Sequence, residues 1–156
     1  DAGQSVARRA QAFGMDIVFH DPYFQGDARS AQACEMAEVF IAADFIVLTC
    51  PSTPETRGMV AEPSLGLMKR GSFIVNVARG DLVVEHDLCD ALARGHLKGA
   101  ALDVFQEEPL PLSSRLRTFD SVIFGAHNGS NTRSGLTRAS ERAANIVIDW
   151  GRGLEL

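Results

Sequence analysis

The chain has 156 residues, of which 46% are hydrophobic and 22% are charged. This composition is typical of one globular domain and excludes disordered, collagen-like and coiled-coil proteins. Lys and Arg together number 15 and Asp and Glu 20, giving a net charge of −5. The basic face of a nucleic-acid-binding protein is therefore not expected.

No apolar run reaches the roughly 20 residues that a membrane-spanning helix needs. No apolar segment follows the basic residues near the N-terminus, as it would in a secretory signal. The cysteines Cys34, Cys50 and Cys89 are widely separated and lack the spacing of metal ligands. We expect a cytoplasmic protein with reduced thiols and without a metal site, nucleic-acid partner or membrane anchor.

Helices and short apolar runs alternate along the first half of the chain. A helix that begins at Gly3 is expected to end before Gly14, and the next strand stops at Asp21-Pro22. The predicted elements are, in chain order, a helix at 3–13, a strand at 17–19, a helix at 30–42 and a strand at 45–48.

The alternation continues in the second half. The predicted elements are a helix at 61–68, a strand at 72–77, a helix at 85–94, strands at 99–104 and 122–124, and a long helix at 132–150. The five strands are nearly continuous apolar runs, which is typical of strands that are covered on both faces. The pattern predicts the α/β class, with one open, doubly wound parallel sheet in a single compact unit.

Gly3 and Asp21 have the positions of a dinucleotide-binding turn. A glycine that opens a helix lets main-chain amides approach a pyrophosphate, and an acid after the second strand binds ribose hydroxyls. The Asp21 carboxylate would repel a 2′-phosphate, which favours NAD over NADP. Both residues also suit an ordinary helix start and an Asp-Pro turn, so this pattern alone leaves both interpretations open.

Three polar residues follow three different predicted strands. Arg79 comes after 72–77, Glu108 after 99–104 and His127 after 122–124. These strand ends form one edge of an open parallel sheet, where ligands bind. A carboxylate beside a histidine stabilises its protonated form, and an arginine orients an acidic substrate and polarises its carbonyl. Taken alone, each residue more often occupies an ordinary surface or loop position.

Four segments carry a family resemblance: ADFIVLTCPSTPETRGMV, LMKRGSFIVNVARGDLVVE, KGAALDVFQEEPL and GAHNGSNT. In this order they resemble the D-isomer-specific 2-hydroxyacid dehydrogenases. That family includes 3-phosphoglycerate, glycerate, glyoxylate/hydroxypyruvate, D-lactate and formate dehydrogenases and a branch of transcriptional corepressors. The resemblance runs from Gly3 into the last predicted helix and implies a Rossmann-like NAD-binding domain.

The resemblance assigns the catalytic roles to Arg79, Glu108 and His127. His127 would exchange the proton of the substrate hydroxyl, Glu108 would support the protonated imidazole, and Arg79 would bind the substrate carboxylate and C2 oxygen. The hydride chemistry belongs to NAD. Formate dehydrogenases resemble this pattern with Gln at the position of Glu108, so Glu108 argues against formate.

The resemblance also implies a set of cofactor-binding residues. Asp21 would bind the adenosine ribose, and Asp103 would contact the nicotinamide side. The set consists of Ala2, Gly3, Asp21, Cys50, Pro51, Thr56, Val77, Ala78, Arg79, Asp103, His127, Gly129 and Ser130.

Two further interpretations remain at this point. One is a non-enzymatic, NAD(H)-sensing binding module similar to the corepressor branch, in which the same three residues are present. The other is a generic Rossmann domain for a different ligand, such as a methyl donor, which requires the four segments to match by coincidence.

The resemblance implies that residues 1–156 are an NAD-binding domain truncated within its glycine motif. We expect residues before Asp1 to hold the missing first strand, and the helix at about 132–150 to return toward an absent substrate-binding domain. The isolated segment is expected to be inactive, and the full-length protein to form a homodimer. The particular 2-hydroxy acid is left open.

Overall fold

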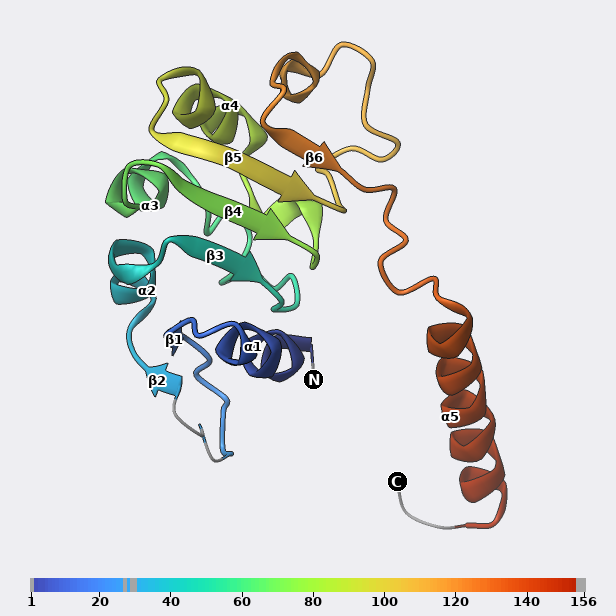
Figure 1. Ribbon diagram of the computed structural model, residues 1–156. Helices are drawn as coiled ribbons and strands as arrows, with labels where there is room; N and C mark the ends of the chain where they lie inside the picture. The colour runs from blue at the N-terminus through green and yellow to red at the C-terminus, as the bar shows by residue number, and fades with distance from the viewer. Residues whose placement is uncertain (1, 27, 29–30, 154–156) are drawn as a thin grey trace.

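The computed structural model describes residues 2–26, 28 and 31–153, and parallel strands dominate this part of the chain (Figure 1). The larger sheet has the strand order β3-β4-β5-β6, and all three neighbouring pairs are parallel. Its strands are β3 (Phe45–Leu48), β4 (Ser72–Asn76), β5 (Leu97–Leu102) and β6 (Val122–Phe124). The predicted α/β class with a parallel sheet is confirmed.

A second, two-stranded sheet lies in the first part of the chain. It pairs β1 (Ile17–Phe19) with β2 (Ala31–Ala33) in parallel, beside the helix α1 (Ala2–Ala12). Gly14 has a φ of +78°, which suits the glycine that follows a helix. Among the described residues no strand joins β1 to β3, so the single continuous sheet expected from the sequence is divided in two.

The helix expected over 30–42 is wrong in its first half. Residues Ala31–Ala33 form β2, and only Met36–Ala42 form the helix α2; Ser30 lies outside the described residues. Alanine and glutamine favour helices, but here their main chain pairs with β1, and the Cys34 amide donates to the Phe19 carbonyl at 3.0 Å. Pairing with a neighbouring strand outweighs the weak local preference of these residues.

Three helices, α2, α3 (Glu62–Leu67) and α4 (Glu85–Ala93), pack beside the larger sheet. The helix α3 packs between α2 and α4, and α4 also contacts β5. Two short 3-10 helices are η1 (Gly80–Leu82), before α4, and η2 (Arg115–Thr118), after β5. The core between these elements contains the fully buried side chains of Leu65, Ile74, Leu82, Leu88 and Leu116.

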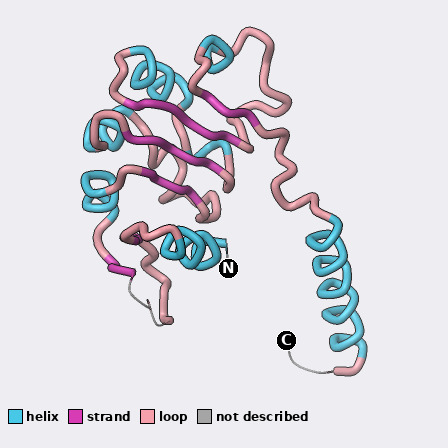
Figure 2. The backbone as a smooth tube through the Cα atoms, in the orientation of Figure 1, coloured by secondary structure: helices cyan, strands magenta, loops and turns pink. Residues whose placement is uncertain are grey.

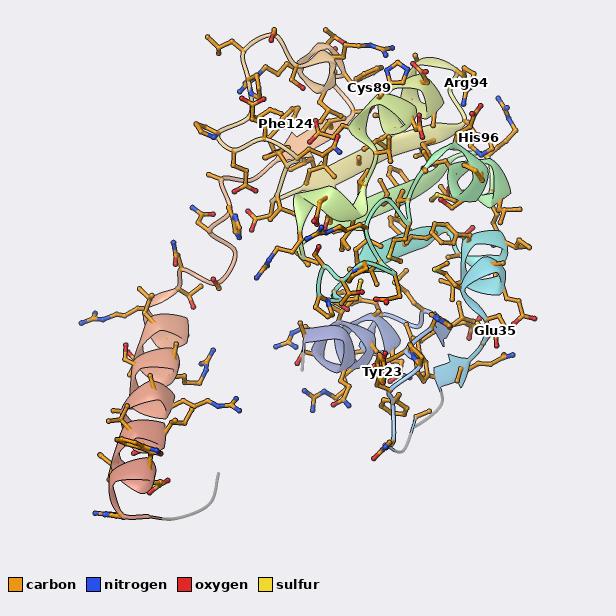
Figure 3. The ribbon with its side chains drawn as sticks, turned by 180° about the vertical axis from the view of Figure 1, so that it is seen from behind. Tyr23, Glu35, Cys89, Arg94, His96 and Phe124 are labelled. Atoms are coloured by element: carbon orange, nitrogen blue, oxygen red, sulfur yellow. The ribbon has the colours of Figure 1, made fainter. Side chains whose placement is uncertain are left out.

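The start and the end of one predicted core strand differ from the structure. The strand expected at 99–104 runs over Leu97–Leu102, because Leu97 already pairs with Ser72 across a register shift. Asp103 lies beyond the strand, and its side chain bonds the loop that follows β6. His96, labelled in Figure 3, is half-buried, and its Nε2 lies 2.9 Å from the Leu65 carbonyl.

The last helix, α5 (Arg133–Gly151), stands apart from the sheets, at the end of an extended segment (Figures 1 and 2). None of its residues is buried, and Leu136, Val147 and Trp150 are more than half exposed. The prediction of one compact unit is therefore wrong for this helix, whose apolar side no element in the described part of the chain buries. No helix in the described ranges has both the length and the apolar character needed to cross a membrane.

Candidate active site

The strands β3 to β6 end at a common edge of the larger sheet. Their arrowheads point to the same side in Figure 1, and the N-terminal end of α1 opens toward that side as well. The segments that follow the four strands begin at Thr49, Val77, Asp103 and Gly125. All the polar groups expected at strand ends in the larger sheet therefore lie along one rim, where open α/β sheets bind ligands.

Glu108 and His127 form the closest pair of functional groups on this rim. The Nδ1 atom of His127 lies 2.7 Å from Oε2 of Glu108, and the other carboxylate oxygen accepts the Phe105 amide at 3.0 Å. The hydrogen bond from His127 lowers the pKa of Glu108, helped by the Phe105 amide. An ionised carboxylate only accepts, so Nδ1 donates, and in the neutral imidazole Nε2 is then the nitrogen that can accept a proton.

The main chain at His127 has a left-handed conformation, with a φ of 52°. This conformation is uncommon for a residue other than glycine and is held by the surrounding structure. The His127 amide donates to the Asp103 carbonyl at 2.8 Å, and the Asp103 carboxylate accepts the Gly129 amide at 3.0 Å. A side chain at Gly125 would collide with the Asp103 carboxylate. Asp103 and Gly125 therefore fix the position of His127.

Arg79 lies on a cavity of about 520 Å³ at the ends of β3 and β4. The cavity is lined by Thr49, Cys50, Pro51, Ser52, Val77, Ala78 and Arg79. Within this turn the Asn76 side chain is buried: its Nδ2 donates to the Arg79 carbonyl at 2.8 Å, and its Oδ1 accepts the Ala78 amide at 3.0 Å. The guanidinium group of Arg79 bonds only the Ala78 carbonyl among the contacts seen, at 2.6 Å, and is exposed on the rim.

The loop after β3 is built by its own side chains. Thr56 Oγ1 donates to the Pro51 carbonyl at 2.8 Å and accepts the Thr53 amide at the same distance. Burial raises the pKa of the Cys50 thiol, and the nearby Asp21 carboxylate contributes to the same shift. Cys50 therefore stays protonated and is a poor nucleophile. The Thr56 side chain therefore stabilises this loop through hydrogen bonds that the sequence pattern did not predict.

Asp21 and Gly3 lie on the two-stranded side of the molecule. The Asp21 carboxylate accepts the Tyr23 amide at 3.0 Å, which forms the expected turn after β1. Gly3 lies in the first turn of α1, an eleven-residue helix, and the N-terminal end of a helix suits an anion.

These residues fit a dinucleotide. The rim offers a helix N-terminus, a single carboxylate and a cavity with small side chains. It also has a loop in which Gly125 lies too close to Asp103 to carry a side chain. Gly129 and Ser130 belong to this last loop, whose amides bond Asp103. No group of three metal-ligating side chains is present in the described part of the chain.

The structure also reveals contacts that the sequence did not predict. Asp81 and Ser52 connect the turn after β4 to the loop after β3, with Ser52 Oγ donating to Asp81 Oδ2 at 2.6 Å. Glu85 and Gln106 bond each other's main-chain amides beside the Glu108 loop. No local pattern pairs such residues, because 29 and 21 positions separate them.

Residues 1–129 match the family described as D-isomer specific 2-hydroxyacid dehydrogenase, NAD binding domain. The chain is 40% identical, over 150 residues, to D-3-phosphoglycerate dehydrogenase of Methanocaldococcus jannaschii, covering 94% of this chain and 28% of that protein. It is 35% identical, over 154 residues, to glyoxylate reductase of Korarchaeum cryptofilum, covering 97% of this chain and 46% of the relative.

Solved structures share this fold. D-lactate dehydrogenase from Aquifex aeolicus, complexed with NAD and lactic acid, superimposes with a TM-score of 0.85 at 29% identity. The match covers 97% of this chain and 50% of that one. The chain thus spans half or less of the length of these three proteins.

Proposed function

The chain belongs to the D-isomer-specific 2-hydroxyacid dehydrogenases, as their NAD-binding domain, and we propose that its protein transfers a hydride between NAD and a D-2-hydroxy acid. The observation that carries this proposal is the 2.7 Å hydrogen bond between His127 and Glu108. A 3-phosphoglycerate, glycerate or hydroxypyruvate/glyoxylate-type substrate is proposed, in keeping with the names of the two curated relatives. Neither relative is named as a corepressor, so the NAD-sensing alternative gains no support.

His127 is the proposed general base for oxidation and the general acid for reduction. Its Nε2 atom takes the proton from the C2 hydroxyl, and the imidazole becomes positively charged. The Glu108 carboxylate, ionised because its pKa is lowered, stabilises that charge through Nδ1. Asp103 and Gly125 hold the ring in place, so little freedom is lost when the substrate binds.

Arg79 is the proposed substrate-binding cation. Its guanidinium group has several donors, and the one visible bond, to the Ala78 carbonyl, leaves others for a carboxylate. A donor close to the C2 oxygen also stabilises the negative charge that grows there during reduction. The buried Asn76 side chain fixes the main chain on which Arg79 stands.

NAD, when bound, supplies the hydride acceptor. The residues proposed to hold it are those derived above from the resemblance, from Ala2 and Gly3 on α1 to Gly129 and Ser130 before α5. Asp21 is proposed to accept the ribose hydroxyls, which selects NAD because a carboxylate repels a 2′-phosphate. Thr56 is proposed to contribute by keeping Pro51 at the edge of the cavity.

The test follows NADH absorbance while the complete protein is offered a panel of D-2-hydroxy acids and 2-keto acids. We expect turnover with at least one acid, and a loss of about 1,000-fold in kcat for His127→Ala. His86→Ala removes an exposed histidine elsewhere in the chain and serves as the control. NADH binding without turnover on any acid would refute the dehydrogenase and favour the sensing module.

The divided sheet supports a proposal about the complete domain. Doubly wound sheets have the classical order 3-2-1-4-5-6, in which the first strand separates the second from the fourth. We propose that one more parallel strand lies between β1 and β3 and joins the two sheets. A structure of the complete protein without a strand between β1 and β3 would contradict the proposed additional strand.

The exposed apolar residues of α5 are proposed to pack against a substrate-binding domain.

We also propose that the complete protein is a cytoplasmic homodimer. The edge strand β6 leaves Ile123 72% exposed and Phe124 41% exposed, and Leu112 nearby in sequence is 91% exposed. Exposed apolar side chains of this kind are common at interfaces between subunits. Light scattering on the complete protein should give twice the mass of one chain, and a monomer at micromolar concentration would refute the dimer.

A further inference from the structure

Asp81 joins two segments that line the cavity beside Arg79. Its Oδ2 atom accepts the Ser52 hydroxyl at 2.6 Å and forms an ion pair with Nε of Arg57 at 3.2 Å. Arg57 Nε also lies 3.4 Å from Ser52 Oγ, so the three side chains form one cluster. Asp81 belongs to the turn after β4, whereas Ser52 and Arg57 belong to the loop after β3.

The far end of this loop is joined to the turn in another way, by main-chain bonds. The Gly58 amide donates to the Asp81 carbonyl at 2.9 Å, and the Val60 amide donates to the Leu82 carbonyl at 3.0 Å. Val60 and Val83 also form a parallel bridge, which continues this pairing. The near end, at Ser52, has no comparable main-chain pairing with the turn among the contacts seen, so its link to the turn is the Asp81 carboxylate.

The near end is also the part that borders the cavity. Ser52, from the loop after β3, and Arg79, from the segment after β4, both line it. Asp81 is two residues from Arg79, and the intervening Gly80 packs so closely on the Phe105 carbonyl that a side chain there would collide with it. The turn therefore cannot move freely, and a bond from Asp81 to Ser52 sets the separation of the two cavity walls.

The Asp81 carboxylate keeps one oxygen without a hydrogen bond. Oδ1 is buried and has no partner among the described residues, although the side chain as a whole is 44% exposed. An unpaired buried acceptor destabilises a fold, so its presence calls for a specific role. A neutral side chain of similar size would serve for packing alone, whereas a charged acceptor strengthens the bonds to Ser52 and Arg57.

On the basis of the proposed dehydrogenase function, we propose that Asp81 is a positioning residue for substrate binding. Its carboxylate holds the Ser52 end of the loop against the turn of Arg79, and this contact places the Arg79 guanidinium for the substrate carboxylate. Asp81 itself does not touch the substrate. Its effect on turnover therefore passes through Arg79 and the cavity wall.

The first experiment compares Asp81→Ala, Asp81→Asn and Asp44→Ala in the complete protein. Asp44 has a similar surface ion pair, with Lys69 at 3.1 Å, but lies before β3, at the opposite end of that strand. We expect Asp81→Ala to lower kcat/KM for the hydroxy acid about 10- to 100-fold, mainly through KM. Asp81→Asn keeps an acceptor for Ser52 and should recover a large part of this loss, while Asp44→Ala should match the unchanged protein. A fall of equal size in Asp44→Ala, or no fall in Asp81→Ala, would overturn the proposal.

A double-mutant cycle combines Asp81→Ala with Arg79→Lys. It distinguishes an effect of Asp81 on the position of Arg79 from a general destabilisation of the fold. If Asp81 acts through Arg79, Asp81→Ala should cost less than about threefold in kcat/KM once Arg79 is replaced. Full additivity of the two losses would overturn the proposal. This readout does not depend on whether Asp81→Ala lowers the melting temperature.

Hydrogen exchange tests the anchoring itself, without any turnover. In the complete protein we expect the amides of Cys50, Ser52 and Thr53 to exchange faster in Asp81→Ala than in Asp44→Ala. Unchanged exchange in this segment would overturn the anchor. If the unsubstituted protein turned over no acid, the proposed function would fail, and the exchange result would still decide whether Asp81 holds the loop.

Discussion

The two sheets of this molecule differ in packing and in the residues that they carry. The four-stranded sheet holds the core, with Ile74 and Leu88 fully buried, and its strand ends bear Arg79, Glu108 and His127. In α1, β1 and β2 no residue is buried, and this side carries Gly3 and Asp21.

The two sheets also differ in their proposed roles. The four-stranded sheet carries the residues proposed for the reaction, and the two-stranded side carries those proposed to select the cofactor. Proton transfer and substrate orientation depend on positions accurate to a fraction of an ångström, and buried strands supply such positions. Selecting one dinucleotide over another depends on the sign of one charge, which a lightly packed turn can present. We therefore expect substitutions on the two sides to have effects of different kind and size.

The largest effect is expected for Arg79→Ala, on the four-stranded side. The loss of the substrate-binding cation should lower kcat/KM for the hydroxy acid about 100- to 1,000-fold, while the NADH dissociation constant changes less than about threefold. Steady-state kinetics and NADH fluorescence titration measure the two quantities. Arg70→Ala, just before the opposite end of β4, is the control. If the main effect of Arg79→Ala were a change in cofactor preference, the assignment of substrate binding to the four-stranded side would be contradicted.

The next effect concerns stability. Leu88→Ala removes a fully buried side chain and should lower the free energy of unfolding by about 2–5 kcal/mol. Val6→Ala in α1, where the side chain is 36% exposed, should lower it by less than about 1 kcal/mol. Urea unfolding of the complete protein measures both. Equal losses would mean that the two sides are packed alike in solution.

A smaller effect is expected for Asp21→Ala, on the two-stranded side. The loss of the carboxylate should shift the ratio of kcat/KM for NAD to that for NADP about tenfold toward NADP, with kcat on NAD little changed. Asp16→Ala, which removes the same charge before β1, is the matched control. An unchanged ratio would remove Asp21 from the ribose site.

The smallest effect is the pH dependence of the Glu108–His127 pair. The pKa of Glu108 is lowered in the folded protein, so the unfolded chain binds more protons at mildly acidic pH. The stability contributed by this carboxylate is present above its ordinary value of about 4.3 and is lost as the pH falls through the lower, folded value.

Thermal unfolding of the unsubstituted protein and Glu108→Gln measures this contribution. The two melting temperatures should differ most near neutral pH and converge as the pH falls through the lowered pKa of Glu108. Glu107→Gln removes the adjacent carboxylate and controls for the loss of one charge. A difference that grows as the pH falls would contradict the assigned direction.

Much of this arrangement was predictable from local sequence. Apolar runs such as Phe45–Leu48, and glycines such as Gly14, mark elements within a few residues, because hydrophobic period and turn chemistry act over short distances. The placement of Arg79, Glu108 and His127 after strands followed from the same pattern. Their assignment to a reaction came from the family resemblance and remains a proposal for this chain.

Other features depended on residues far apart in the chain. Ala31–Ala33 became a strand because β1 lies beside it. The bonds of His127 to Glu108, 19 positions away, and of Asp81 to Ser52, 29 positions away, exist only once the strands are ordered side by side. The left-handed main chain of His127 likewise depends on Asp103 of the neighbouring segment.

The sequence by itself determined the α/β alternation, the positions of the strand ends and the residue types on them, since each depends on a window of neighbouring residues. Only the tertiary structure decided which of those residues meet, and that the strands divide into two sheets. The physical reason is that a parallel sheet pairs segments distant in sequence through their main chains, and main-chain pairing leaves little trace in the side chains.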